Sequence, residues 1–172
     1  AARFIPHKGL HYLIEAFRQT RTNKKLVIAG DAYFTSAYAR RLKELAGDDE
    51  RILLTGFQHG RTLTELFANA YLFVLPSETE GQSLALLEAA GAGTCILASN
   101  IPENMEVIRQ GGKTIGYAFR NKDPRDLQRR LSELLRTPAQ VRERGAEAKS
   151  VARTKFNWKT VARSVERVYA QA

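Results

Sequence analysis

Two glutamates eight positions apart, Glu80 and Glu88, are the residues of this chain best placed to carry out chemistry. Before them an apolar, strand-like run, Leu72–Leu75, breaks at Pro76, and an amphipathic helix is expected over Ser83–Ala90. The exposed amides and the positive dipole end at the start of such a helix favour a phosphate group. The pattern therefore predicts a ligand-binding edge.

The spacing suggests what each glutamate would bind. Glu88 lies about five residues inside the expected helix, which is roughly 7 to 8 Å along its axis. A diphosphate at the helix start would place its ribose near Glu88 and an attached sugar near Glu80, and a carboxylate can accept two hydrogen bonds from a vicinal diol. The backbone amides expected to bind phosphate or sugar oxygens are those of Gly81, Gln82, Ser83 and Leu84.

The spacing of the two glutamates is by itself weak support for a ligand-binding site. Asp and Glu make up 18 of 172 residues, so an acid is followed by another eight positions later about one time in ten. Exposed acids on either side of a helix start, with Gly81 as an ordinary turn residue, would explain the pattern equally well. Other segments of the chain are needed to decide between a binding site and ordinary exposed acids.

Those segments resemble a known family. Glu80-Gly81, Glu88-Ala89 and Gly93, after an apolar strand and Pro76-Ser77, resemble the paired-glutamate motif of retaining nucleotide-sugar glycosyltransferases with the GT-B fold, in particular family four. Four more segments match in order: Arg3–Gly9 resembles the family's phosphate clamp, Leu26–Asp31 its second strand and turn, Ile52–Phe57 its third, and Asn100–Glu103 the loop after its fifth. The resemblance covers nearly the whole chain.

The resemblance implies a role for each matching residue. Arg3 and Lys8 would hold the diphosphate and neutralise the charge that develops on the leaving nucleotide. Glu80 would bind the hydroxyls of the donor sugar, which makes it the third catalytic candidate, and Glu88 would bind the ribose. The loop beginning Gly56-Phe57 would receive the base, mainly through backbone groups.

Two departures from the family pattern leave the donor sugar open. Gln82-Ser83 stands where many relatives carry Phe-Gly, and Gly30-Asp31-Ala32 stands where many carry Gly-x-Gly. Gln82 leaves the backbone amides available but adds a polar side chain, so it affects the identity of the donor sugar rather than the class of reaction.

The order of apolar runs predicts an α/β fold: a Rossmann-like parallel sheet with helices on both faces and a C-terminal helical extension, which is one half of a GT-B fold. Strands are expected at Lys25–Ala29, Arg51–Leu54, Tyr71–Leu75, Cys95–Ala98 and Gly116–Phe119. Helices are expected at Leu10–Thr20, Tyr33–Ala46, Leu63–Asn69, Ser83–Ala90 and Glu103–Arg109. Further helices should begin at Asp123-Pro124, at Thr137-Pro138 and near a cap at Asn157.

We treat residues 1–172 as one nucleotide-sugar-binding domain, with an α/β core over 1–122 and helices over 123–172. In a GT-B enzyme the candidate loops would face an N-terminal acceptor-binding domain, which this chain does not contain. The isolated chain is therefore expected to bind the donor and to be inactive in transfer.

The composition of the chain limits the classes of partner that it is expected to bind. The net charge is +9, from 27 basic and 18 acidic residues, and much of the excess falls in the C-terminal helical segment. Its spacing suits solvated helix faces, or alternatively a face that meets a membrane surface or a lipid-linked acceptor. No nucleic-acid motif accompanies the charge, so nucleic acid is not an expected partner.

No apolar run approaches ~18 residues and no leader is visible. These two observations predict a cytoplasmic protein; the alternative is a cytoplasmic protein that binds peripherally to the inner face of the membrane.

No cofactor or metal is expected. The single cysteine, Cys95, lies in a strand-like run and suits a structural role, and the three histidines are scattered. No Asp-x-Asp pair follows a strand, so positive charge at the diphosphate would come from Arg3 and Lys8.

Three readings of function stay open. The first is the donor-binding half of a retaining glycosyltransferase; the second is a nucleotide-sugar epimerase or a sugar phosphorylase on the same architecture; the third is a non-enzymatic basic binding module. A nucleotide-binding titration separates the third from the others, and product analysis separates the first two.

Overall fold

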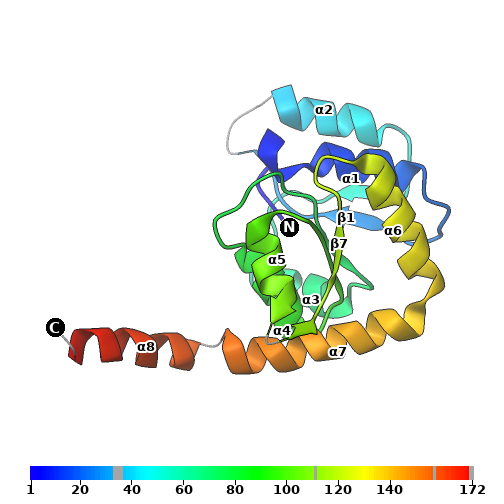
Figure 1. Ribbon diagram of the computed structural model, residues 1–172. Coiled ribbons are helices and arrows are strands. Elements are labelled where there is room, and N and C mark those ends of the chain that lie inside the picture. Colours follow the sequence, from blue (N-terminus) through cyan, green and yellow to red (C-terminus); the bar gives the residue numbers. More distant parts are fainter. Residues whose placement is uncertain (33–36, 111, 157, 171–172) are drawn as a thin grey trace.

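Helices and parallel strands alternate along the chain, as the sequence predicts (Figure 1). The computed structural model describes residues 1–32, 37–110, 112–156 and 158–170, without the side chains of 158–161 and 164. The strands are β1 Leu26–Ile28, β2 Ile52–Leu54, β3 Phe73–Leu75, β4 Ile96–Ser99, β5 Arg109–Gln110, β6 Lys113–Thr114 and β7 Tyr117–Phe119. The helices are the 3-10 turn η1 Pro6–Lys8, α1 Leu10–Arg18, α2 Ala37–Ala46, α3 Gly60–Asn69, α4 Leu84–Ala92, α5 Pro102–Ile108, α6 Pro124–Arg136, α7 Pro138–Lys155 and α8 Trp158–Ala170.

The parallel strands form two groups rather than one continuous sheet. In the first, β1 pairs with β2, with Leu26 opposite Ile52. In the second, β4 lies between β3 and β7, and Leu97 is opposite both Val74 and Tyr117. The predicted parallel sheet is confirmed, but β1 and β3 are not hydrogen-bonded to each other.

Helices cover both faces of the strands (Figure 1). Side chains of β4 alternate between the two layers, as the period of a strand requires. Leu97 packs with Leu127 of α6, whereas Ile96 and Ala98 pack with Ala148 of α7. A strand that is apolar on both faces is the pattern of a buried parallel sheet, so the burial matches the expected fold class.

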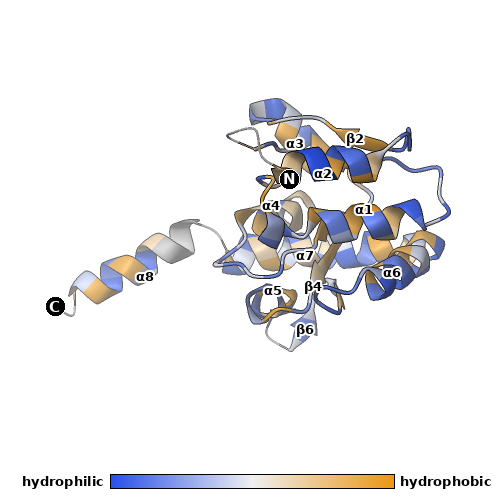
Figure 2. Cartoon of the chain, turned by 90° about the horizontal axis from the view of Figure 1, so that it is seen from above, coloured by the Kyte–Doolittle hydropathy of each residue, from blue (hydrophilic) through white to orange (hydrophobic). Residues whose placement is uncertain are grey.

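Helix α7 packs closely against the turn after α4. At Gly145 of α7 an added Cβ would lie 2.3 Å from the carbonyl oxygen of Gly93 and 3.1 Å from the amide nitrogen of Cys95. The helix backbone therefore rests directly on the backbone of this turn, with no room for a side chain between them. Helix α8 projects away from the rest of the molecule and mixes hydrophobic with hydrophilic residues (Figures 1 and 2).

Several boundaries differ from those predicted. Helix α3 begins at Gly60, three residues before the predicted start at Leu63. The helix predicted to reach Arg109 ends at Ile108, because Arg109 enters the antiparallel β5–β6 pair, which the sequence reading missed. The predicted helix start at Tyr33 and the cap at Asn157 lie outside the described residues.

The C-terminal helices begin where expected. Asp123 caps α6, and its side chain accepts hydrogen bonds from the amides of Arg125 and Asp126. Pro138 opens α7. Within the described residues, no helix combines the length and the apolar character needed to cross a lipid bilayer.

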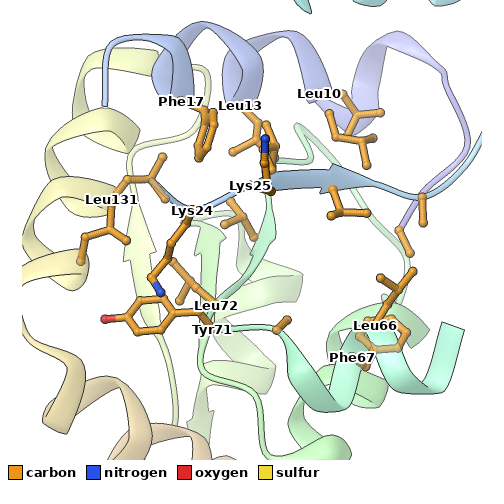
Figure 3. A pocket seen from close by; sticks show the side chains of 18 of the residues that line it. Leu10, Leu13, Phe17, Lys24, Lys25, Leu66, Phe67, Tyr71, Leu72 and Leu131 are labelled. Carbon is orange, nitrogen blue, oxygen red and sulfur yellow. The ribbon is translucent and has the colours of Figure 1, made fainter. Parts of the chain in front are cut away.

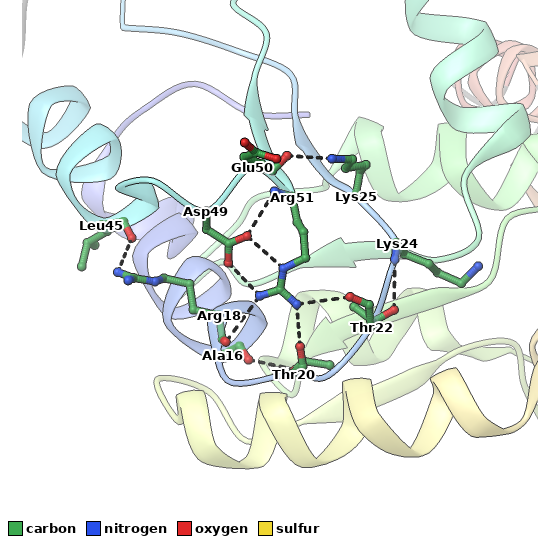
Figure 4. A network of polar contacts seen from close by, with 10 residues as sticks. All are labelled: Ala16, Arg18, Thr20, Thr22, Lys24, Lys25, Leu45, Asp49, Glu50 and Arg51. Carbon is green, nitrogen blue, oxygen red and sulfur yellow. Dashed lines mark hydrogen bonds and ion pairs between the residues drawn. The ribbon is translucent and has the colours of Figure 1, made fainter.

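A network around Arg51 joins the loops at the amino ends of β1 and β2 (Figure 4). Its guanidinium donates to both carboxylate oxygens of Asp49, at 2.9 and 2.7 Å. It also donates to the carbonyl oxygens of Thr20 and Thr22, at 2.8 and 3.3 Å, and lies over the ring of Phe17. The hydrogen bonds from Arg51 lower the pKa of Asp49 to about 2. This network fixes the end of the molecule opposite the candidate site.

We predict that Arg51→Met lowers the urea midpoint of unfolding at pH 7 and that this difference shrinks between pH 4 and pH 2. A carboxylate with a depressed pKa in the folded state stabilises it above the pKa of the unfolded state, near 4, and loses this contribution as the pH falls through 2. A smaller difference should persist, since Arg51 also binds two carbonyls. The matched control is Arg61→Met, which removes the exposed ion pair to Glu65 and should change little. A difference that does not vary with pH would contradict this assignment.

Candidate functional site

The loops that carry the predicted site residues meet at the carboxyl edge of the strands. Parallel strands end on the same side, so the loops that follow them are neighbours in space. Hydrogen bonds join these loops in a chain: Ala2 N to Ala29 O, Gly30 N to Gly56 O, Glu78 N to His7 O, Ser99 Oγ to Ser77 O, and Asn121 N to Asn100 Oδ1. The convergence expected from the order of motifs is therefore present.

Lys8 and Glu80 form an ion pair at the centre of this edge. The Lys8 ammonium lies 2.8 and 2.7 Å from the two carboxylate oxygens of Glu80, and the Ser77 hydroxyl donates to the first of these oxygens at 2.6 Å. The side chains of Lys8 and Glu80 are only 18% and 6% exposed. Charged groups with so little exposure to water need a partner of opposite charge. Here the Lys8 ammonium and the Glu80 carboxylate compensate each other.

Backbone geometry places Lys8 beside Glu80. Lys8 ends the short turn η1, and Gly9 follows with φ of +64°, a conformation that suits glycine. A Cβ at Gly9 would lie 2.0 Å from the carbonyl oxygen of Pro76, which begins the loop that carries Glu80. The close approach of these two backbones brings the ammonium and the carboxylate within reach.

Glu78 anchors the same loop from the other side. Its carboxylate accepts a hydrogen bond from the Tyr12 hydroxyl at 2.9 Å and pairs with the Lys122 ammonium at 2.8 Å, while its carbonyl accepts from the Asn121 side chain at 3.3 Å. The bond from Lys122 is the main cause of a lowered pKa at Glu78, and burial, together with the bond to Glu78, raises the pKa of Tyr12 to about 12.

The sequence analysis did not predict the contacts of Glu78 with Tyr12 and Lys122. Glu78 looks like an ordinary acid before a helix, and Lys122 lies far along the chain. Lys122 adopts a φ of +59°, which is uncommon for a residue with a side chain. The polar turn Asn121-Lys122-Asp123 before a helix was the one available signal, and it points to a turn rather than to a contact with Glu78.

Helix α4 starts where the sequence predicts. Ser83 is its N-cap, and the Ser83 hydroxyl accepts from the amide of Leu86. Among the described residues, the amides of Gly81, Gln82, Ser83 and Leu84 have no hydrogen-bond partner within the chain. They leave the donor groups of the helix start available to an anion. Glu88 is exposed, about one turn further along the helix.

The other predicted residues also lie at this edge. Arg3 is exposed, and its neighbour Phe4 donates its amide to the carbonyl of Asp31. Gly56 accepts the amide of Gly30, and Phe57 is 40% exposed and stacks on His59 with ring centroids 6.2 Å apart. Within the described residues, neither Arg3 nor Glu88 forms a hydrogen bond or an ion pair with Lys8 or Glu80. The roles of Arg3, Glu88 and Phe57 stay predictions.

Nothing in the described residues groups three His, Cys, Asp or Glu side chains in a way that could hold a metal ion. Cys95 is buried, and burial raises the pKa of its thiol to about 12, so it is not a thiolate nucleophile in the folded chain. His11 is buried too, with Nδ1 2.9 Å from the Tyr38 hydroxyl. The polar chemistry of this edge rests on Lys8, Glu80 and the open amides of α4.

The sequence profile of one protein family, described as glycosyl transferases group 1, matches residues 1–151. The chain belongs to this family. It is 32% identical to glycogen synthase from Mycobacterium tuberculosis over 96% of this chain and 40% of that protein. Family membership agrees with the resemblance seen in the motifs.

Solved structures agree on the fold. HepE from Anabaena, determined in complex with UDP-glucose, superposes with a TM-score of 0.90 at 21% identity, over 99% of this chain and 47% of HepE. The C-terminal domain of a glycosyl transferase group 1 family protein from Francisella tularensis superposes with a TM-score of 0.77 at 23% identity, over 91% of this chain and 83% of that domain. This chain thus spans less than half the length of glycogen synthase and of HepE.

We predict that Gly9→Ala lowers the free energy of unfolding by at least about 2 kcal/mol, because the new Cβ would meet the Pro76 carbonyl and the positive φ disfavours a side chain. Gly81→Ala is the matched control in the same site: nothing lies within 4 Å of its added Cβ, so the change should stay within about 0.5 kcal/mol. Urea unfolding of both variants measures the difference. Equal stabilities would show that the Gly9 backbone has another way to pass Pro76.

Proposed function

We propose that this chain is the donor-binding half of a retaining glycosyltransferase, which moves a sugar from a nucleotide diphosphate sugar to an acceptor. The observation that carries the proposal is the largely buried Lys8–Glu80 pair beside the start of α4, where four amides have no hydrogen-bond partner among the described residues. Membership in the glycosyl transferases group 1 supports the class of reaction. The presence of UDP-glucose in the complex of HepE, a protein of the same fold, supports a nucleotide sugar as donor.

The ion pair suggests how the two halves of the donor are bound together. A diphosphate at the start of α4 would attract the Lys8 ammonium away from Glu80, since phosphate oxygens carry more negative charge than one carboxylate. Glu80 would then keep its hydrogen bond from Ser77 and expose its other oxygen to hydroxyls of the sugar. Binding of the diphosphate thereby prepares the carboxylate for the sugar.

The remaining residues complete the donor site. Arg3 adds a second cation for the diphosphate, and Glu88, one turn along α4, accepts hydrogen bonds from the ribose. Gly56 and the exposed ring of Phe57 receive the base. Together these groups bind the nucleotide along the carboxyl edge, from the base loop to Glu80.

The chemical contribution of the site is electrostatic. Lys8, Arg3 and the helix start stabilise the negative charge of the departing diphosphate, and the Glu80 carboxylate stabilises the cationic sugar ring. Because these groups supply the positive charge, we propose that the reaction uses neither a cofactor nor a metal ion.

The acceptor would be bound by a domain outside this chain, since the chain spans less than half of glycogen synthase and of HepE. The basic residues of the C-terminal helices could bring such an enzyme to a membrane surface that carries a lipid-linked acceptor. A cytoplasmic location, with contact to the inner membrane face, stays a prediction from charge and composition.

We predict that Lys8→Met and Glu88→Gln each weaken binding of a nucleoside diphosphate by about tenfold to a hundredfold, the loss expected for a hydrogen bond to a charged group. Calorimetric titration with UDP, ADP and GDP measures this effect and identifies the base. Lys24→Met is the matched control, because Lys24 lies over the ring of Tyr71 near the amino ends of the strands. Unchanged affinity for every nucleotide in both variants would refute the donor site.

Glu80→Gln should behave differently. It removes the charge that holds Lys8, so affinity for the bare diphosphate should stay equal or rise, whereas the added affinity for the matching nucleotide sugar should be lost. A parallel loss of affinity for both ligands would mean that Glu80 supports the phosphate site rather than the sugar.

The isolated chain should bind a nucleotide sugar and transfer none of it. Positioning of the acceptor and exclusion of water require the facing domain, and such positioning contributes several kcal/mol to lowering the barrier. Incubation with the tightest-binding nucleotide sugar and candidate acceptors, followed by mass spectrometry, measures transfer. A rate close to that of the full-length enzyme would show that this chain holds the whole catalytic site.

A further inference from the structure

Three polar side chains lie fully buried behind the loop that carries Glu80. Ser77 and Ser99 are 0% exposed and Asn104 is 1% exposed. Ser99 ends β4, whose preceding residues 96–98 are apolar and equally buried. A polar group costs free energy in such surroundings unless it is hydrogen-bonded. The hydrogen bonds of these three side chains therefore show what they contribute to the fold.

These side chains form a hydrogen-bond network that ends on the Glu80 carboxylate. The Asn104 amide group donates one hydrogen to the carbonyl oxygen of Ser99 at 3.2 Å and one to the Ser99 hydroxyl oxygen at 3.0 Å. The Ser99 hydroxyl has a single hydrogen, which it donates to the carbonyl oxygen of Ser77 at 2.5 Å. The Ser77 hydroxyl in turn donates to Oε1 of Glu80 at 2.6 Å. Asn104 is thus connected to Glu80 through two serines.

The network begins in regular elements of the fold. Strand β4 is hydrogen-bonded to β3 on one side and to β7 on the other, and Ser99 lies at its carboxyl end. Asn104 belongs to α5, which packs Val107 into the core. Residues 76–83, which include Glu80, are described throughout and form neither helix nor strand. The network therefore fixes part of an irregular loop to a central strand and a helix.

The Glu80 carboxylate depends on this network once a donor is bound. In the described part of the chain, its hydrogen bonds come from Lys8 and from Ser77. In the proposed function, on which this step rests, the diphosphate draws the Lys8 ammonium away. Ser77 then remains as the partner that holds the carboxylate in place, and Ser77 is itself held at its carbonyl oxygen by Ser99.

We propose that Ser99 and Asn104 are positioning residues for recognition of the donor sugar. They act through Ser77, which holds one oxygen of the Glu80 carboxylate and leaves the other to the hydroxyls of the sugar. Neither Ser99 nor Asn104 is exposed enough to contact a ligand. Their loss should therefore weaken recognition of the sugar and leave binding of the diphosphate, which belongs to Lys8 and the start of α4, unchanged.

The test measures one ratio, the dissociation constant of a nucleotide sugar divided by that of its nucleoside diphosphate. The probes are UDP-glucose with UDP, ADP-glucose with ADP, and GDP-mannose with GDP, titrated calorimetrically into the 172-residue chain. Ser99→Ala removes a single oxygen atom and should raise the ratio about tenfold, the scale of one hydrogen bond to a charged group. Asn104→Ala should raise it less, because the Ser99 hydroxyl keeps its acceptor. Affinity for the diphosphate itself should stay within about twofold of that of the unsubstituted chain.

Thr94→Val is the matched control. Thr94 precedes β4 at the opposite end from Ser99; it too is buried, and its hydroxyl donates to a backbone carbonyl, that of Phe67, at 2.5 Å. Phe67 lines the apolar cavity seen in Figure 3, and among the described residues that line this cavity none belongs to the candidate site. The control loses the same kind of hydrogen bond and should leave the ratio unchanged. An equal rise of the ratio in both variants would reduce Ser99 to a general stabilising role and overturn the proposal.

A double variant tests whether Ser99 acts through Ser77. If it does, Ser99→Ala should raise the ratio in the unsubstituted chain but raise it no further in the Ser77→Ala variant. Equal effects in both backgrounds would overturn this route.

The remaining outcomes separate this proposal from the proposed function. An unchanged ratio in Ser99→Ala would overturn the positioning role while leaving the donor site intact. Binding of the diphosphates but of no nucleotide sugar would show that Glu80 does not recognise the sugar, and would overturn the positioning role too. If the unsubstituted chain bound none of the six probes, the proposed function would be refuted together with it.

Discussion

The candidate site depends on parallel pairing of short, buried strands. Because these strands run in the same direction, their carboxyl ends lie on one side, and the loops that follow them are forced together. The loops are then joined by backbone contacts, such as the bond from Glu78 to His7 and the close approach of Gly9 to Pro76. Side chains far apart in the sequence become neighbours as a consequence of strand direction.

Within that edge, charge compensation explains the arrangement of side chains. Glu80 is almost fully buried, and its carboxylate is balanced by Lys8 and hydrogen-bonded by Ser77. Glu78, two residues earlier, is balanced in the same way by Lys122 and Tyr12. The loop between β3 and α4 is thus held at two points by ion pairs from different parts of the chain, so its acidic side chains are positioned before any ligand arrives.

Periodicity and the motifs predicted the strands, most helix positions, the start of α4 and the common edge of the site. Local patterns suffice there, because apolar alternation and capping residues act over a few positions. They could not predict the pairing of Lys8 with Glu80, which lie 72 residues apart, in a chain with 27 basic and 18 acidic residues. The early start of α3 at Gly60 was missed because glycine at φ +55° seldom begins a helix. The division of the strands into two groups also has no local signature.

The contact between α7 and the turn after α4 links the site to a distant surface. Backbone rests on backbone at Gly145 and Gly93, so α7 has no side-chain layer there that could deform. Helix α4 carries the open amides at its amino end and meets this turn at its carboxyl end. A shift of α4 toward this contact would have to be taken up by α7, because no side chain lies between the two backbones. An anion bound at the amino end of α4, as we propose, would therefore meet a helix that is already held in place at its carboxyl end.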